Sequence, residues 1–170
     1  TNPASGGIWS SNHTSLAGIG SLTGIITGVV PGNPVITYTL TTGCIAATTI
    51  TVNPLPTSVT GTLTVCAGLT TTLNSTPSGG TWTSGNVGVA TVGSSSGIVT
   101  GVAAGTVVIS YTLGTGCYAT AIVTVNPLPA AITGLNNVCT GFTIVLTDAS
   151  TGGTWTSSSS SASVGSTTGV

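Results

Sequence analysis

Charged side chains are almost absent from this 170-residue sequence. It contains no lysine or arginine, one acidic residue (Asp148), one histidine (His13) and no methionine. In ordinary globular proteins about a quarter of the residues are charged. Nucleic acids and anionic membrane surfaces are held by lysine and arginine, which neutralise phosphate groups. Their absence excludes nucleic acid as a partner.

The sequence also has few residues that could form a metal site or a catalytic site. A zinc site needs cysteine and histidine at short spacing, and a calcium site needs several carboxylate or carbonyl oxygens. Here the four cysteines lie far apart in sequence and His13 stands alone. Acid–base catalysis also needs paired titratable groups. We therefore expect no metal, no cofactor and no catalytic residues, and we predict that the protein is not an enzyme.

Long uninterrupted hydrophobic runs are also missing, although the mean hydropathy is +0.61. The most apolar stretch, Ile98 to Leu113, is interrupted by glycine, threonine and serine. It is too short and too broken for a membrane-spanning helix. Valine, isoleucine, leucine and threonine are abundant, and these residues favour β-structure. We expect an all-β fold.

What the sequence does contain is a long internal repeat. Trp9, Trp82 and Trp155 are equally spaced, since 82 − 9 and 155 − 82 both equal 73. The same offset relates further pairs: Tyr38 with Tyr111, Cys44 with Cys117, Cys66 with Cys139, and Val52–Pro56 with Val125–Pro129. A period of 73 residues is too long for a solenoid coil and suits one small sandwich domain.

The two Asn-Pro-Leu-Pro segments mark the predicted joints, because closely spaced prolines favour an extended connector. They divide the chain into a first repeat (1–56, the C-terminal part of a domain), a complete middle repeat (57–129) and a third repeat (130–170, the N-terminal part of a domain). Two explanations fit the partial repeats. The sequence is a window on a longer array, or neighbouring copies complete each other, since 130–170 carries the first strands that 1–56 lacks.

Within the middle repeat, short alternating segments are separated by turn residues, as in a β-sandwich. The predicted strands are Leu63–Val65, Leu69–Asn74, Gly80–Ser84, Ala90–Val92, Ile98–Val102, Thr106–Leu113 and Ala119–Val125. The recurrent aromatic residues are the predicted core: Trp9, Trp82, Trp155, Tyr38 and Tyr111. The alternative, a carbohydrate platform, is less favoured because a small domain needs that buried area.

These motifs resemble the bacterial immunoglobulin-like domain of group 2. The resemblance is carried by Gly79–Ser84, Val89–Val92, Gly97–Thr106 and Ile109–Tyr111, in that order. The cysteine segments and the Asn-Pro-Leu-Pro joints are similar to repeats of large secreted adhesins and gliding-associated surface proteins. The resemblance implies tandem Ig-like β-sandwiches, extracellular or cell-surface display, and a stalk, adhesin or fibre role without chemistry.

The sequences of the repeats differ from one another at two places. Pro34 occupies the position of Val107, which removes one backbone donor from the predicted strand. The third repeat replaces the Gly85–Ala90 region with the serine run Ser157–Ser161 and is one residue shorter. We expect the repeat surfaces to differ in their contacts.

Cys66 and Cys117 belong to one repeat and are separated by 117 − 66 = 51 residues. We predict a disulfide between them, which would add roughly 4 kcal/mol of stability. Cys44 and Cys139 would then have partners one repeat outside this sequence. A bond between Cys44 and Cys66 is the alternative.

The uncharged surface suggests two roles. Loss of charge repulsion favours self-association of threonine-rich strands into a fibre whose partners are copies of the chain. The alternative is a passive adhesin stalk, rigidified by its joints, with a binding domain elsewhere. Asn12 and Asn74 begin Asn-x-Ser/Thr tripeptides and are candidate acceptors for glycans in either role.

Overall fold

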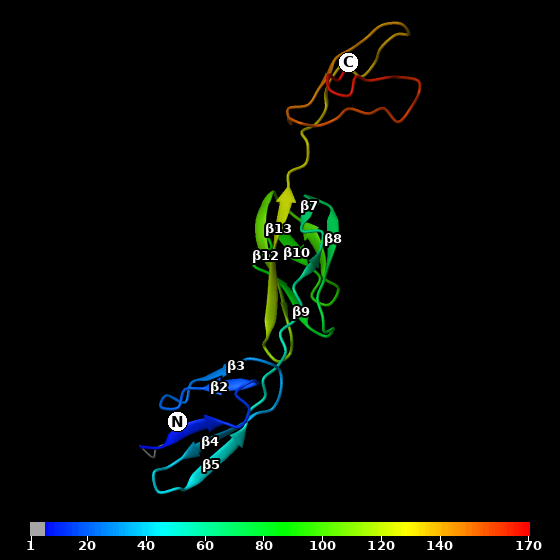
Figure 1. Cartoon of the computed structure of the whole chain (residues 1–170). Helices are drawn as coiled ribbons and strands as arrows, with labels where there is room; N and C mark the ends of the chain where they lie inside the picture. The colour runs from blue at the N-terminus through cyan, green and yellow to red at the C-terminus, as the bar shows by residue number, and fades with distance from the viewer. Residues whose placement is uncertain (1–5) are drawn as a thin grey trace.

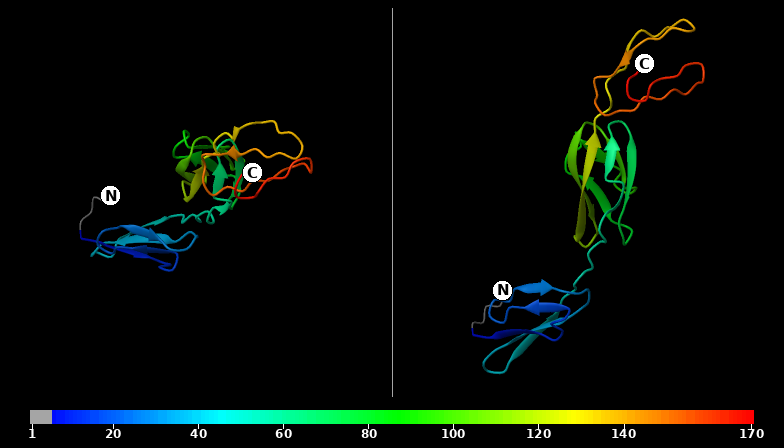
Figure 2. Two further views of the ribbon diagram at one scale, coloured as in Figure 1. Left: turned by 90° about the horizontal axis from the view of Figure 1, so that it is seen from above. Right: turned by 45° about the horizontal axis from the view of Figure 1, so that its top comes forward.

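The computed structural model describes residues 6–170, and within that range it contains strands, turns and extended segments but no helix. The expectation of an all-β chain is therefore confirmed. Three parts follow one another along the length of the molecule, with the N-terminus in the first part and the C-terminus in the last (Figures 1 and 2). The Asn-Pro-Leu-Pro segments lie between the parts.

The middle part consists of two four-stranded sheets. Their orders are β10-β11-β8-β6 and β7-β13-β12-β9. The strands are β6 (Thr60–Gly61), β7 (Thr64–Cys66), β8 (Thr70–Asn74), β9 (Thr81–Ser84), β10 (Ala90–Val92), β11 (Ile98–Gly101), β12 (Gly105–Thr112) and β13 (Tyr118–Asn126). One cluster of buried side chains is drawn from both sheets, so the core lies between them.

Alternation along the strands explains how this core forms. Successive side chains of a strand point to opposite faces of the sheet. In β12, Val107, Ile109 and Tyr111 are buried, whereas Val108 between them is exposed. Each strand predicted from alternation coincides with an observed strand to within one residue at each end. Only β6 has no predicted counterpart, because it is two residues long and contains Gly61.

The recurrent tryptophan and tyrosine are neighbours on adjacent strands. Trp82 of β9 lies opposite Tyr111 of β12, both are buried, and their ring centroids are 4.7 Å apart. In the first repeat Trp9 lies opposite Tyr38 with the same 4.7 Å separation, but Trp9 is only half-buried. Trp155 is likewise half-buried.

Gly80, two residues before Trp82, leaves the space that the Tyr111 side chain occupies. Its backbone N–H donates to the Tyr111 hydroxyl oxygen over 2.8 Å, and that hydroxyl donates to the Pro77 carbonyl over 2.8 Å. A Cβ on Gly80 would overlap the Tyr111 ring. Gly7 donates to the Tyr38 hydroxyl in the same way, over 3.0 Å. The glycine therefore makes room for a tyrosine that anchors the start of the tryptophan strand.

The first part contains five strands that correspond to β9 to β13 of the middle part. Sheets β1-β4-β5 and β2-β3 are formed by β1 (Ile8–Ser11), β2 (Ala17–Ile19), β3 (Ile26–Gly28), β4 (Val35–Thr39) and β5 (Ile45–Thr49). Pro34 has no backbone N–H to donate, and β4 begins at the residue after it. Before Pro34, the only pairing with the end of this repeat is the isolated bridge between Gly32 and Val52.

The third part contains one short strand pair, β14 (Thr133–Gly134) with β15 (Leu146–Thr147). Its register matches that of β6 with β8, because Thr60 faces Asn74 and Gly61 faces Leu73 in the middle part. Residues 154–170 form no strand and run through turns and extended backbone.

Candidate functional site

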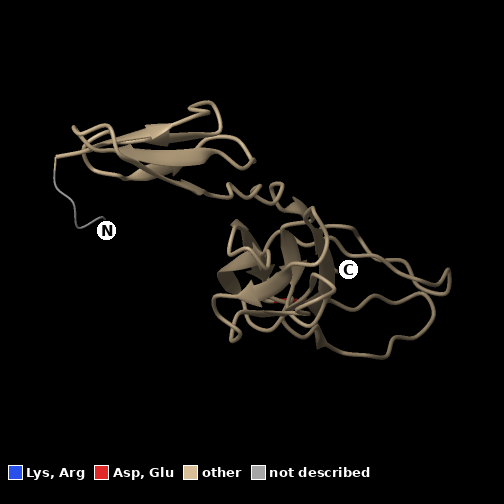
Figure 3. Cartoon of the chain, turned by 90° about the horizontal axis from the view of Figure 1, so that it is seen from below, with Lys and Arg blue, Asp and Glu red and all other residues tan. Residues whose placement is uncertain are grey.

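The few titratable side chains of residues 6–170 form no cluster that could bind a metal ion. No group of three His, Cys, Asp or Glu residues that could hold a metal ion occurs in that range. His13 is exposed in the first repeat, and Asp148 lies in the third, where its carboxylate accepts a 2.6 Å hydrogen bond from the Ser150 N–H. Figure 3 shows a chain almost without charged residues. The non-enzymatic role remains a prediction.

Membrane-spanning helices are also not found: within residues 6–170 no helix has the length and apolar character needed to cross a bilayer.

The predicted disulfide between Cys66 and Cys117 is wrong, and both residues are free thiols. β7 runs parallel to β13 and places Cys66 opposite Asn126, at the end of β13. Cys117 precedes the start of β13, nine residues (126 − 117) before Asn126. At about 3.3 Å per residue the two cysteines are roughly 30 Å apart, whereas a disulfide requires Cα atoms within about 7 Å.

The alternative bond between Cys44 and Cys66 fails for the same reason. Cys44 lies in the turn before β5, and β5 runs from that turn toward the joint. Cys66 ends β7 and lies opposite Asn126 at the end of β13, and both strands end at the side of the middle part that faces the following joint (Figure 1). Cys44 and Cys139 are exposed and free.

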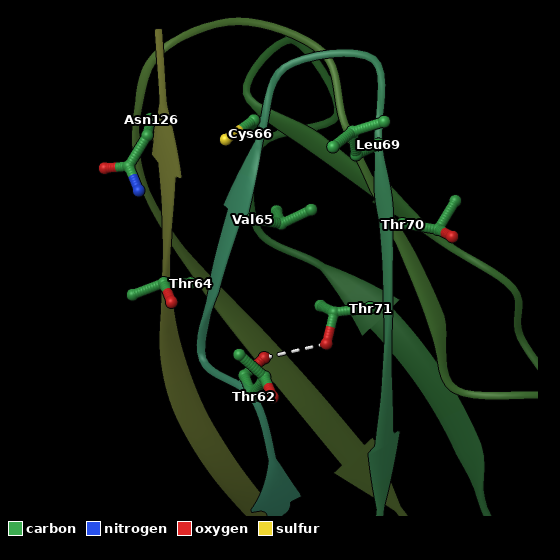
Figure 4. Close-up of a pocket in the computed structure, with 8 residues that line it drawn as sticks. All are labelled: Thr62, Thr64, Val65, Cys66, Leu69, Thr70, Thr71 and Asn126. Atoms are coloured by element: carbon green, nitrogen blue, oxygen red, sulfur yellow. Dashed lines mark hydrogen bonds between the residues drawn. The ribbon is translucent and has the colours of Figure 1, made fainter. Parts of the chain in front are cut away.

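A groove opens between β7 of one sheet and β8 of the other (Figure 4). It encloses about 350 Å³ and is lined mainly by threonines, with Val65, Cys66, Leu69 and Asn126. The Thr71 hydroxyl donates to the Thr62 carbonyl across it, over 3.0 Å. No aromatic side chain lines the groove, so it lacks the stacking surface that a carbohydrate platform requires.

A larger cavity, of about 700 Å³, lies in the third repeat. Leu146, Trp155, Ile132 and Leu128 supply its apolar wall. Leu146 and Trp155 correspond to Leu73 and Trp82, which in the middle repeat are buried in the core cluster between the two sheets. The cavity is therefore the open side of an incompletely covered core.

The first repeat is open on the complementary side. Ile26 of β3 is 41% exposed, whereas Val99 at the equivalent position of β11 is 0% exposed. In the middle repeat Val99 faces Thr71 of β8, and β7 covers the edge of β13. The first repeat has no strand on the outer edge of β3 or β5 within residues 6–56.

The two candidate glycan acceptors differ in their surroundings. The Asn12 side-chain oxygen accepts a 2.8 Å hydrogen bond from the Val35 N–H, so this side chain bridges β1 to the start of β4. Asn74 is exposed at the end of β8, and Thr60 donates to its backbone carbonyl. Glycosylation at either position stays a prediction.

The sequence predicts that the first and third repeats are partial domains, but it does not predict the exposure of particular side chains: in the structure Ile26 is exposed and Leu146 is half-buried. The hydrophobic pattern marks both as inward-facing, and it contains no signal for which inward faces are left uncovered.

No family model matches this chain, and no curated protein matches it. Among solved structures it is similar to a C-terminal 282-residue fragment of intimin in complex with the intimin-binding domain of the translocated intimin receptor. The identity is 18% and the TM-score 0.45, covering 72% of this chain and 53% of that fragment. The chain thus spans about half the length of that fragment.

It is also similar to domains 1–6 of the surface-layer protein SbsC (21% identity, TM-score 0.33, covering 82% of this chain and 24% of that one). Drosophila N-cadherin EC1-4 shows 9% identity and a TM-score of 0.39, covering 75% of this chain and 43% of that one. All of these TM-scores lie below 0.5 and assign no family.

Proposed function

We propose that this chain is a non-enzymatic structural repeat protein of an extracellular or cell-surface bacterial fibre, filament or array, built from copies of itself. In this proposal each 73-residue repeat is one Ig-like β-sandwich of the group 2 type, and the Asn-Pro-Leu-Pro segments are joints between sandwiches. The observation that carries the proposal is a surface with almost no charge that still displays apolar strand residues.

The outer face of β12 and β13 shows this surface most clearly. Val108 and Ile122 face each other across the two strands and are 45% and 62% exposed. Monomeric proteins normally surround such positions with charged side chains, whose mutual repulsion keeps copies apart. Here the neighbouring outward residues are threonine and serine, which hydrogen-bond without repelling. This composition favours association between copies.

A passive adhesin stalk is the second candidate, and the arrangement in series along one axis favours it (Figure 2). A stalk needs only stable repeats and stiff joints, because a separate domain would bind the ligand. Carbohydrate binding by the repeats themselves has little support, because the threonine-lined groove has no aromatic wall.

Electron microscopy of native material distinguishes the two candidates. A fibre subunit is expected to form regular filaments whose axial repeat accommodates a whole number of these domains. Isolated beaded rods of uniform length would refute the fibre proposal and favour the stalk. Immunogold labelling of intact cells tests surface display, and intact mass matching the bare sequence would refute glycosylation.

A further inference from the structure

The middle repeat lies in series between two joints, and the chain enters and leaves it at opposite ends (Figure 1). The entering chain comes from the first Asn-Pro-Leu-Pro segment and forms β6 and then β7. The leaving chain is β13, which ends at Asn126, directly before Pro127 of the second segment. Tension applied along the molecule therefore passes through the middle repeat from β6 and β7 to β13.

The first and last of these strands along the load path, β7 and β13, lie side by side. They pair over three residues, from Thr64 to Cys66 on β7, and they run parallel. All the other strand pairs within residues 6–170 are antiparallel. The parallel ladder thus occurs once in the described chain, at the place where the entering and leaving segments meet.

Hydrogen bonds extend this ladder beyond both ends of β7. The Thr124 N–H donates to the Leu63 carbonyl over 2.9 Å, just before the strand begins. The Ala67 N–H donates to the Asn126 carbonyl, also over 2.9 Å, just after the strand ends. The whole length of β7 is therefore tied to the end of β13.

Parallel pairing determines how the ladder is loaded. Because the two strands run in the same direction, the start of β7 and the end of β13 lie at opposite ends of the ladder. Tension pulls the start of β7 toward the first repeat and the end of β13 toward the third. The strands are then pulled past each other along their length, whereas their hydrogen bonds run across it. All pairs carry the load at once and must break together.

We propose that the β7–β13 ladder is the mechanical clamp of the repeat, meaning the set of contacts that resists tension along the array and must shear before the core opens. The clamp goes beyond the proposed structural role, because it assigns the resistance to force to one pair of strands. It applies to a fibre and to a stalk alike, since both place the repeats in series.

The contacts made before β7 are the weaker part of the load path. The Thr57 N–H donates to the Thr76 carbonyl over 2.8 Å, and the Ser75 hydroxyl donates to the Thr57 carbonyl over 2.8 Å. β6 then pairs with β8 over two residues only. These contacts align the entering chain with the strands, and the longer β7–β13 ladder supplies the larger barrier.

No covalent bond bypasses the clamp, because all four cysteines are free. Once the ladder shears, the whole segment from Thr57 to Asn126 can extend. It contains 126 − 57 + 1 = 70 residues, which span roughly 230–250 Å when fully extended. A large gain in chain length therefore identifies the unfolding of the middle repeat in a force measurement.

Single-molecule force spectroscopy tests the clamp by pulling the 170-residue chain in two directions. Both measurements use a chain in which Cys44, Cys117 and Cys139 are replaced by serine. In the first, handles at the two ends of the chain load the ladder along its strands. In the second, one handle is attached to Cys66, which borders the groove of Figure 4, and the other to the C-terminus.

The second direction peels the ladder open, because Cys66 lies opposite Asn126 at the same end of it. Peeling breaks the residue pairs one at a time. We expect the peak force to be about threefold higher in the first direction, because three pairs then break together.

Ala67→Pro removes one hydrogen bond of the clamp while preserving the backbone around it. Ala67 is the second residue of a turn in which the Leu69 N–H donates to the Cys66 carbonyl over 3.0 Å and Gly68 has a φ of 80°. This is the geometry of a type II turn, which favours proline at that position. The variant should therefore fold and unfold at a lower peak force.

The matched control is Ala103→Pro. It also removes one backbone N–H, which donates to the Val89 carbonyl over 3.2 Å and lies outside the β7–β13 ladder. Forced unfolding follows the unfolding rate rather than the equilibrium stability. We therefore expect the peak force of this control to equal that of the unchanged chain.

Three results would overturn the inference: equal peak forces in the two pulling directions, an unchanged peak force in Ala67→Pro, or an equal loss in Ala103→Pro. The proposed fibre function fails on different evidence, namely native material without filaments. A clamp that withstands force in a chain that forms no filaments would keep this inference and refute the fibre.

Discussion

At the scale of single residues, the aromatic pair and its glycine set the geometry of each repeat. Trp82 and Tyr111 fill the centre of a small core, and Gly80 admits the tyrosine hydroxyl to the backbone. The same residues recur in the first repeat with the same contacts.

Replacement of Trp82 by alanine should strongly destabilise the middle repeat. Loss of a buried large aromatic side chain costs about 3–5 kcal/mol. At roughly 4–8 °C per kcal/mol, a domain of this size should melt more than about 12 °C lower. Calorimetry of the whole chain measures this shift. Trp155→Ala is the control and should have a smaller effect, because Trp155 is only half-buried; equal losses would contradict the assignment of Trp82 to a closed core.

Replacement of Gly80 by alanine tests the tyrosine anchor. The added methyl group would overlap the Tyr111 ring, and overpacking of this kind costs about 1–3 kcal/mol. Gly153→Ala is the matched control, since no atom outside its immediate neighbours lies within 4 Å of the added carbon. Denaturant unfolding should show a loss for Gly80→Ala and little change for Gly153→Ala. A neutral Gly80→Ala would show that the tyrosine contact is dispensable.

At the scale of elements, the direction of β7 determines how far apart Cys66 and Cys117 lie. Because β7 pairs with β13 in parallel, Cys66 lies at the opposite end of the sheet from Cys117. The strands themselves could be predicted to within one residue, because alternation is a local property. Their pairing could not, because a short strand with this pattern fits either edge and either direction.

Reduction should therefore leave the stability of the middle repeat unchanged. An intradomain disulfide would contribute roughly 4 kcal/mol, which reduction would remove. We expect the same unfolding midpoint with and without dithiothreitol, and the same midpoint for the Cys66→Ser and Cys117→Ser variants. Peptide mapping under oxidising conditions provides the independent check. A peptide linking Cys66 to Cys117 would refute the observed strand arrangement.

At the scale of the whole molecule, the near-absence of charge determines how copies would associate in the proposed fibre. Salt screens interactions between charges over about 10 Å at 0.1 M. This chain has one acidic residue, one histidine and no lysine or arginine. Contacts between copies must therefore come from apolar packing and neutral hydrogen bonds.

Self-association should accordingly be insensitive to sodium chloride. We expect sedimentation profiles at about 20 mM and about 500 mM salt to overlay, because little electrostatic attraction or repulsion is available to be screened. Ammonium sulfate, which strengthens apolar burial by exclusion from the surface, should instead promote association. A marked loss of oligomers in sodium chloride would show that charges outside this sequence control assembly.

The sequence by itself determined the all-β class, the repeat spacing, the positions of the strands and the lack of groups for metal or acid–base chemistry. These properties depend on residue type and on short-range periodicity, which can be seen in the linear chain. Only the tertiary structure decided that Cys66 and Cys117 lie at opposite ends of a sheet and that Trp82 packs on Tyr111 in the core. Burial depends on which strands pair and in which direction, and those pairings join residues far apart in sequence.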